Sequence, residues 1–262
     1  MAFQDKVEDL RKRFDQALRA SAFWPSILWL QKEFHKEAPV RLWVVGGTIR
    51  DFILETSNMI IDVDVMLEKC PSREVLEKVI TRGGTFRKNM MGGYKWYPAP
   101  AISKAKEGLE MDMWRIEESI EPGDAPTPEL GVSRFDLSIN ALGWDVEKRR
   151  FINPLGALQI LLDETRATPM ELLTEKIKPG NAGRLILRAI KYGPKLGIPL
   201  GEKTLRWIRE HEKELDDLPP DKIRYVFRAI DYQAIRKEIE DCCDELLSPA
   251  YAAKVKEALY NP

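Results

Sequence analysis

The sequence predicts an α+β protein, in which a mixed half with short strands precedes a half made of helices alone. Between residues 40 and 152, apolar residues alternate in short segments, as in half-buried strands. After Leu155 they recur at helical spacing, over 158–163, 170–177, 182–191, 204–214, 221–230, 234–247 and 250–259. A mixed half followed by helices indicates two adjoining modules rather than one alternating fold.

Domain boundaries are expected where the pattern changes. Residues 1–38 are expected to form N-terminal helices, over 7–18 and 27–34, that pack on the next domain. Residues 39–155 are expected to form the mixed domain, and residues 156–262 the helical one.

Seven segments of the mixed domain have the composition of strands, and the last two are expected to form a hairpin. They are 40–45, 60–67, 85–88, 94–97, 109–114, 141–145 and 149–152. Helices are expected over 48–54 and 74–81, and a loop over the acidic, proline-containing residues 119–130.

Composition excludes several classes of function. The 41 Lys and Arg residues balance 42 Asp and Glu, which argues against a highly basic nucleic-acid coat protein but allows a local basic groove. Cys70, Cys242 and Cys243 have neither disulfide nor zinc-site spacing, and reduced thiols fit a reducing cytosol. Only two histidines are present, so catalysis is expected to depend on carboxylates.

A cytoplasmic location without membrane attachment is expected. The first residues are charged and lack the apolar run of a secretory signal. The most apolar early stretch, Phe23 to Leu30, is too short to span a bilayer and contains Pro25.

Asp62 and Asp64 are the strongest candidates for catalytic metal ligands. They are two residues apart on a predicted strand, so both side chains emerge on one face. Two close carboxylates repel each other unless they share cations or face water. Oxygen ligands of this kind suit Mg²⁺, with Mn²⁺ as a possible substitute, and two ions about 4 Å apart would serve phosphoryl chemistry. For an isolated Asp-x-Asp, a solvent-facing strand edge is the commoner interpretation.

Two neighbouring features support the metal interpretation. Gly46 and Gly47 join a strand to a short helix, a junction that lets backbone N–H groups approach a phosphate, although Gly-Gly alone is more often a tight turn. Asp112 is the preferred third metal ligand, with Glu110 as the alternative, because both alternate onto one face of a predicted strand. A half-exposed strand of mixed polarity is the competing interpretation.

Taken together, these segments resemble the class II tRNA nucleotidyltransferase and bacterial poly(A) polymerase family, of the polymerase β-type superfamily. WVVGGTIRDFIL followed by DVDVMLE resembles the family's GGxVRDxLL and DxD segments. SRFDLSINALGWD resembles RRDFTINAL, with Phe135 in place of the second arginine, and RLILRAIKYGPKLGI resembles the neck helix. The resemblance covers roughly residues 40 to 200, and the ordered conjunction is more specific than any one segment.

The resemblance implies an enzyme that moves a nucleoside monophosphate from a nucleoside triphosphate to an RNA 3′ end. It implies a five-stranded head followed by a helical neck and a short body. It makes Asp62 and Asp64 catalytic ligands of two Mg²⁺ ions, and Asp112 is expected to join them as the third ligand from its place on a neighbouring predicted strand. The residues it implies in nucleotide binding are Gly46, Gly47, Arg50, Asp51, Arg134, Asp136, Asn140, Asn181, Arg184 and Arg188.

The sequence departs from the family pattern in the neck. Asn181 and Ala182 stand where the family's EDxxR motif has its two acids, and Arg184 fits the motif's arginine only with one inserted residue. Because an amide and a carboxylate differ in donor capacity, the base edge that is read can change. We therefore expect addition of one nucleotide type, AMP, rather than an ordered CCA sequence.

The acceptor and the role of the basic residues stay open at this point. Family members that work on tRNA generally continue into further helical domains, so tRNA or a smaller RNA is expected as partner. Modification of a protein or small molecule, and non-catalytic binding of RNA or nucleotide, are the alternatives. A basic stripe on the neck helix could meet phosphate or be a solvated face; it comprises Arg184, Arg188, Lys191 and Lys195. The oligomeric state is unknown from sequence.

Overall fold

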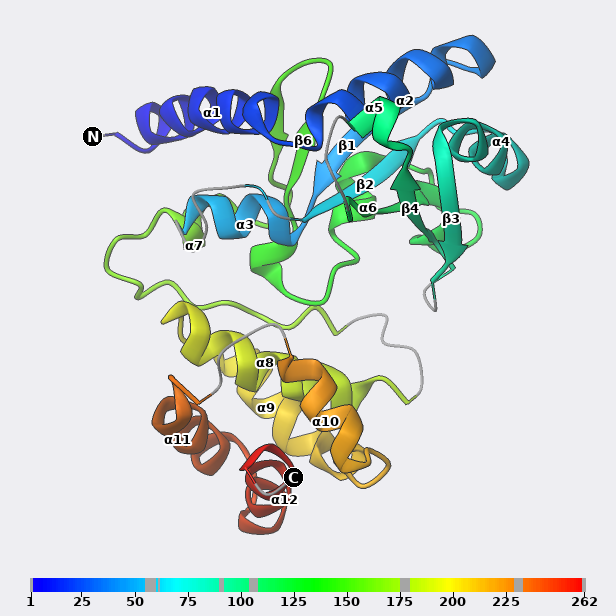
Figure 1. The fold of residues 1–262 in the computed structure, drawn as a ribbon. Helices are drawn as coiled ribbons and strands as arrows, with labels where there is room; N and C mark the ends of the chain where they lie inside the picture. The colour runs from blue at the N-terminus through cyan, green and yellow to red at the C-terminus, as the bar shows by residue number, and fades with distance from the viewer. Residues whose placement is uncertain are drawn as a thin grey trace. The chain divides into compact units, whose positions relative to one another are not determined.

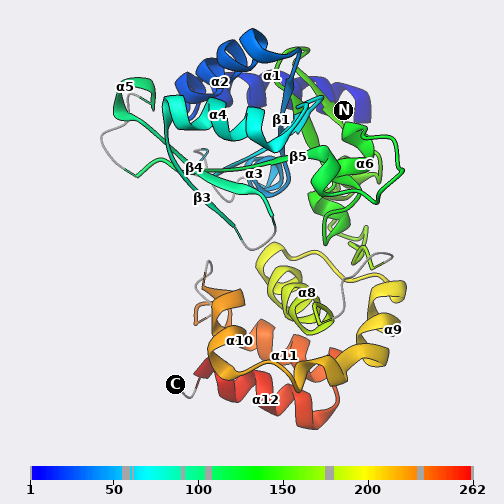
Figure 2. The same cartoon turned by 90° about the vertical axis from the view of Figure 1, so that its right-hand side faces the viewer.

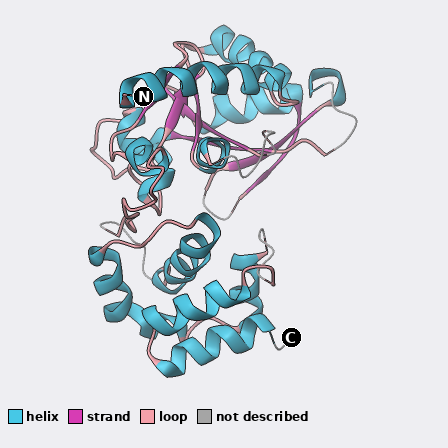
Figure 3. Ribbon diagram, turned by 90° about the vertical axis from the view of Figure 1, so that its left-hand side faces the viewer, coloured by secondary structure: helices cyan, strands magenta, loops and turns pink. Residues whose placement is uncertain are grey.

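The computed structural model describes residues 2–54, 60, 62–89, 92–103, 108–174, 180–228 and 233–260. The chain divides into two compact units. The head unit comprises Met1–Phe135 and Ile139–Leu162, and the helical unit comprises Asp136–Ser138 and Asp163–Pro262. Figure 3 shows the strands in the head unit, while helices and loops form the helical unit. The α+β prediction, with a mixed sheet before helices, is confirmed.

A seven-stranded mixed sheet forms the centre of the head unit. The strands are β1 (Arg41–Val45), β2 (Val63–Glu68), β3 (Gly84–Lys88), β4 (Tyr94–Pro98), β5 (Met111–Arg115), β6 (Gly143–Asp145) and β7 (Arg150–Ile152). Their order is β3-β4-β5-β2-β1-β6-β7, and β2 pairs with β5 in parallel while the other neighbours are antiparallel. The seven strands predicted from composition are confirmed, whereas the five-stranded head implied by the resemblance is wrong, because the β6–β7 hairpin pairs with β1 and extends the same sheet by two strands.

Seven α-helices accompany this sheet among the described residues of the head unit. They are α1 (Phe3–Ala20), α2 (Trp24–Glu37), α3 (Gly47–Ile53), α4 (Arg73–Gly83), α5 (Pro100–Ser103), α6 (Pro128–Val132) and α7 (Ala157–Leu161). The short helix α6 lies partly within the expected loop 119–130. The Thr127 hydroxyl caps it by accepting a hydrogen bond from the Leu130 N–H, and Pro128 suits its first position.

One face of the sheet is buried under helices α1, α2 and α4 (Figure 1). Trp29 of α2 stacks on Trp96 of β4 at a ring-centroid distance of 5.7 Å. Phe14 of α1 meets Trp144 of β6 edge-on at 5.3 Å. Trp96 and Trp144 are completely buried, so this face is the main hydrophobic core and cannot serve as an aqueous site.

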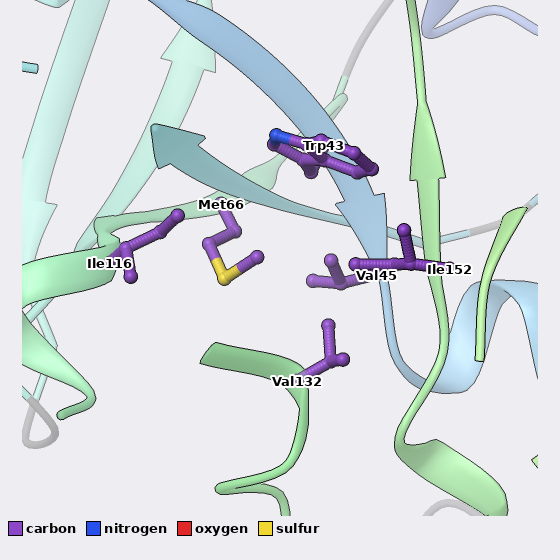
Figure 4. Close-up of a cluster of buried hydrophobic side chains, with 6 residues drawn as sticks. All are labelled: Trp43, Val45, Met66, Ile116, Val132 and Ile152. Carbon is purple, nitrogen blue, oxygen red and sulfur yellow. The ribbon is translucent and has the colours of Figure 1, made fainter. Parts of the chain in front are cut away.

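The opposite face of the sheet carries a smaller apolar cluster and then changes to charge. Figure 4 shows the cluster, which consists of Trp43, Val45, Met66, Ile116, Val132 and Ile152. Met66 pairs with Trp43 in β1, and two residues earlier in β2 the same face presents Asp64. The expected alternation in β2 therefore holds, and its second face carries Asp64, the buried Met66 and the buried Glu68. Ile61, expected on the first face, lies outside the described residues.

The helical unit packs around α8. Its helices are α8 (Ala182–Leu196), α9 (Glu202–His211), α10 (Pro220–Phe227), α11 (Arg236–Leu246) and α12 (Pro249–Tyr260), with a 3₁₀ turn over Glu212–Leu215. Helix α8 contacts α9, α10 and α11 (Figure 2). Gly183 allows the close approach of the 3₁₀ turn, since a Cβ there would lie 2.6 Å from the Glu214 carbonyl oxygen. Pro194 does not stop the helix, which ends at Gly197 in the left-handed conformation.

The helix expected over 170–177 is absent from the part of this segment that the structure describes. Met170 forms a bridge with Leu200, and Leu172 forms one with Leu137. The Ser138 N–H donates to the Glu171 carbonyl, and the Leu173 N–H to the Asp136 carbonyl. Backbone pairing with these two segments replaces the helical hydrogen bonds that the apolar spacing suggested.

Within the described residues, no helix is long and apolar enough to cross a bilayer.

Candidate active site

Three charged side chains form a row across the second face of the head sheet. Asp64 of β2 is in register with Asp112 of β5, and Asp112 is in register with Lys95 of β4. Register partners lie on the same face of a sheet, so all three side chains project to one side. Asp112 therefore lies on the same sheet face as Asp64, in the neighbouring strand. Asp62 immediately precedes β2 and is exposed.

The acids of this row disfavour one another's charge. Burial, followed by the charges of Asp62 and Asp112, raises the pKa of Asp64 to about 8. Loss of solvent around the carboxyl group and the charge of Asp112 also raise the pKa of Asp62, although the residue is exposed overall. Lys95 opposes both shifts. Carboxylates with raised pKa values are stabilised by a nearby cation, which is what a divalent-ion site provides.

The donor set fits a hard divalent cation, although its side chains do not converge. Among the described residues, no three acidic, histidine or cysteine side chains are already arranged around a common ion position. Asp62 and Asp64 supply carboxylate oxygens from one strand, and Asp112 supplies others from its neighbour. Asp112 instead faces Lys95, at 3.2 Å between carboxylate and ammonium, and the Asn89 amide nitrogen at 3.4 Å. Both carboxylate oxygens of Asp112 therefore contact partners other than the Asp62–Asp64 pair.

Glu110, the alternative third ligand, is engaged elsewhere. It lies just before β5, and its carboxylate accepts a hydrogen bond of 2.6 Å from the Lys95 ammonium. Sequence reasoning missed both Lys95 and Asn89. The available signal was Lys95 itself, a charge between Tyr94 and Trp96 in a predicted strand, which alternation places on the polar face.

The Gly46–Gly47 turn lies directly beside Asp64. Gly46 has φ +71°, a conformation that favours glycine, and α3 begins at the next residue. A Cβ on Gly46 would lie 3.7 Å from a carboxylate oxygen of Asp64 and 3.6 Å from the Phe135 ring. The Thr48 hydroxyl donates to the Asp62 carbonyl oxygen at 2.8 Å, which ties the start of α3 to the Asp-x-Asp segment. The N–H groups that begin a helix have no carbonyl partner within it, so this turn brings such donors close to the acids.

Arg50, Asp51 and Asn140 form one cluster behind this turn. Arg50 is only 3% exposed; its Nε and Nη2 donate to the two carboxylate oxygens of Asp51, and its Nη1 donates to Oδ1 of the buried Asn140 at 2.5 Å. This geometry holds α3 against the segment that contains Asn140. The structure thus brings these three candidate nucleotide-binding residues together, in contact with one another.

Arg134 and Phe135 are the last two residues of Met1–Phe135, the first of the two segments that make up the head unit. Arg134 forms an ion pair of 2.9 Å with Asp124. Phe135, which occupies the position of the family's second arginine, contacts the Trp114 ring edge-on at 6.2 Å and packs against the apolar cluster of Figure 4. An aromatic ring therefore borders Gly46 at the place where a second guanidinium was expected.

The remaining candidates belong to the helical unit. Asp136 forms an ion pair with Arg188 of α8, so these two are brought together. Asn181 precedes α8 at its N-cap position without a side-chain capping hydrogen bond, and Arg184 is exposed. The basic stripe is not continuous on the surface: Lys191 is buried and donates to the Val226 carbonyl oxygen at 2.9 Å.

Comparison with known proteins confirms the resemblance found in the sequence. Residues 42–164 match the family model of the poly A polymerase head domain. This match supports the prediction of a nucleotidyltransferase-type enzyme, since it covers the Gly-Gly turn, the Asp-x-Asp pair and Asp112. No curated protein sequence matches the chain significantly.

Solved structures share the fold at low sequence identity. A CCA-adding enzyme in complex with CTP is 20% identical, with a TM-score of 0.57 over 95% of this chain and 53% of that one. The Thermotoga maritima CCA-adding enzyme complexed with tRNA_CCA is 19% identical, with a TM-score of 0.56 over 95% and 52%. A tRNA nucleotidyltransferase with a primer tRNA and an incoming ATP analog is 19% identical, with a TM-score of 0.59 over 87% and 62%. The chain thus spans about half to three fifths of the length of these proteins.

Proposed function

We propose that this protein, whose head domain is of the poly A polymerase type, transfers a nucleoside monophosphate from a nucleoside triphosphate to an RNA 3′ end and releases pyrophosphate. One observation carries the proposal: the Gly46–Gly47 turn lies beside the row of acids, since a Cβ added to Gly46 would lie 3.7 Å from a carboxylate oxygen of Asp64. The backbone N–H groups of this turn are the proposed donors to phosphate, and the nearby acids are the proposed ligands of a cation.

The proposed reaction forms a bond between the acceptor's 3′ oxygen and the α-phosphorus and breaks the bond between the α-phosphorus and the bridging oxygen of the pyrophosphate. The hydroxyl proton leaves with this attack. Asp62 and Asp64 would hold divalent ions, with Asp112 as the third ligand, and such ions lower the hydroxyl pKa and neutralise charge on the leaving group. The N–H groups at the start of α3 would bind phosphate oxygens.

RNA is the proposed acceptor because of what the structural relatives contain. Two of the three relatives cited were solved with tRNA, one with tRNA_CCA and one with a primer tRNA. The proposed partners are therefore an NTP and either tRNA or a smaller RNA.

The neck residues support the choice of a single nucleotide. Ala182 begins α8 as a buried residue, and Asn181 before it offers an amide rather than an acid. A missing hydrogen-bond partner costs about 1–3 kcal/mol, enough to reset a preference by tenfold or more. Given a tRNA that lacks its CCA end, with CTP and ATP at equal concentration, the protein is expected to add AMP alone. Sequencing the product ends measures this, and accurate CCA completion would contradict it.

The proposed function is tested by following labelled nucleotide. The protein is incubated with Mg²⁺, total cellular RNA and each of four α-³²P-labelled NTPs in turn, and products are separated into RNA, protein and small molecules. Label in RNA is expected from the wild type and not from a variant with both Asp62→Asn and Asp64→Asn. Label in protein or a small molecule would instead support the alternative acceptor, and no label in any fraction would leave only nucleotide or RNA binding.

A further inference from the structure

Lys95 is a mostly buried cation that lies among four acidic side chains, and the reaction proposed above gives it no role. Its side chain is 18% exposed, and its ammonium contacts Glu110 at 2.6 Å and Asp112 at 3.2 Å. A lysine side chain is an ammonium at neutral pH, so Lys95 carries a positive charge into the acidic row.

The Lys95 ammonium lies beside Asp112, which is a proposed metal ligand. Asp112 lies between Asp64 and Lys95 across the sheet, in register with both. Asn89 approaches the other carboxylate oxygen of Asp112 at 3.4 Å, and Asn89 is itself held because its side-chain oxygen accepts from the Gly93 N–H at 2.9 Å. Both carboxylate oxygens of Asp112 are thus contacted by partners from the β3–β4 side of the sheet.

We propose that Lys95 weakens the binding of divalent ions, because its ammonium is paired with the Asp112 carboxylate. An ion held jointly by Asp64 and Asp112 must displace this ammonium. This rests on the proposed function only in taking Asp62 and Asp64 as metal ligands. Two effects act in the same direction: Lys95 neutralises one ligand, and its charge repels a cation at the neighbouring pair.

Substitutions of Lys95 and Glu110 are expected to change ion affinity in opposite directions. Lys95→Gln removes the competing charge and releases Asp112, so Mn²⁺ should bind about tenfold more tightly, the order expected for a unit charge a few ångströms away and partly screened. Glu110→Gln leaves Asp112 as the only carboxylate that holds the ammonium and removes one negative charge, so Mn²⁺ should bind more weakly. Lys95→Arg keeps the charge and should stay near the wild type.

The test is a titration of the full-length protein with Mn²⁺ alone, without nucleotide, followed by electron paramagnetic resonance of the free ion. Lys88→Gln is the matched control, because Lys88 is a strand lysine paired with Glu77 and its side chain is 64% exposed. Circular dichroism and thermal unfolding verify that each variant is folded. If Lys95→Gln does not fold, the weaker binding expected of Glu110→Gln decides the question alone.

Unchanged, weaker or undetectable Mn²⁺ binding by a folded Lys95→Gln variant would overturn the inference, since Lys95 would then be at most a structural partner of Asp112. The labelled-NTP assay reports the proposed function separately. Transfer activity with unchanged ion affinity would remove only the role of Lys95, whereas tighter binding without any transfer product would remove only the proposed reaction.

Discussion

Asp64→Ala should reduce nucleotidyl transfer by about a thousandfold or more, while the protein stays folded. The carboxylate is a proposed ligand of the ions that stabilise the transition state, and that stabilisation amounts to several kcal/mol in metal-assisted phosphoryl transfer. Single-turnover incorporation of labelled AMP into RNA measures the loss. Asp244→Ala is the control, because Asp244 is an exposed acid of α11 paired with Lys256 and should leave the rate unchanged.

The same substitution should stabilise the metal-free protein at neutral pH. The pKa of Asp64 is raised by burial and by neighbouring acids, so between about pH 4 and pH 8 the folded state binds more protons than the unfolded state. Stability of the wild type in EDTA therefore falls as pH rises through this window, and Asp64→Ala should lessen that fall. Tm measured at pH 5 and pH 8 tests the direction of this change in stability.

Wild-type transfer activity in the Asp64→Ala protein would show that the site is placed wrongly.

Arg50→Leu should lower the free energy of unfolding by about 2–4 kcal/mol. The substitution removes the hydrogen-bond partner of two side chains. The amide of Asn140 is buried and is left without this donor, whereas the carboxylate of Asp51 is about one third exposed and so recovers some solvation. Urea unfolding followed by circular dichroism measures the change. Arg82→Leu is the matched control: Arg82 is paired with Glu37 but 42% exposed, and its loss should cost under about 1 kcal/mol.

The outcome also bears on what Arg50 does. A drop in stability without a matching change in the KM for ATP would make Arg50 a residue that positions α3 and the Gly46–Gly47 turn. If Arg50→Leu were as stable as the wild type but bound ATP poorly, the buried cluster would be the wrong explanation, and direct contact with the nucleotide would be favoured.

Local spacing was enough to predict the parts of the site that lie close together in the chain. The two-residue repeat of β2 placed Asp62 and Asp64 together, and the Gly46–Gly47 pair marked the junction of β1 with α3. Alternation also placed Asp112 on the correct face once β5 lay beside β2.

The rest of the site depends on pairings between distant segments, which spacing does not specify. Lys95 meets Asp112 only because β4 is in register with β5, and Asp136 meets Arg188 through the fold of the helical unit. The segment around Met170 shows the same limit. Its apolar spacing fits a helix, but the neighbouring backbone at Leu137 and Leu200 provides the hydrogen bonds that make it extended.

The most direct measurement of the central claim is a crystal structure with Mn²⁺ and a nonhydrolysable ATP analogue, in which anomalous scattering locates the ions. The account predicts anomalous density at coordination distance from the carboxylates of Asp62 and Asp64, with the triphosphate against the Gly46–Gly47 turn. Ions and triphosphate bound elsewhere, with Asp62 and Asp64 facing only solvent, would contradict it.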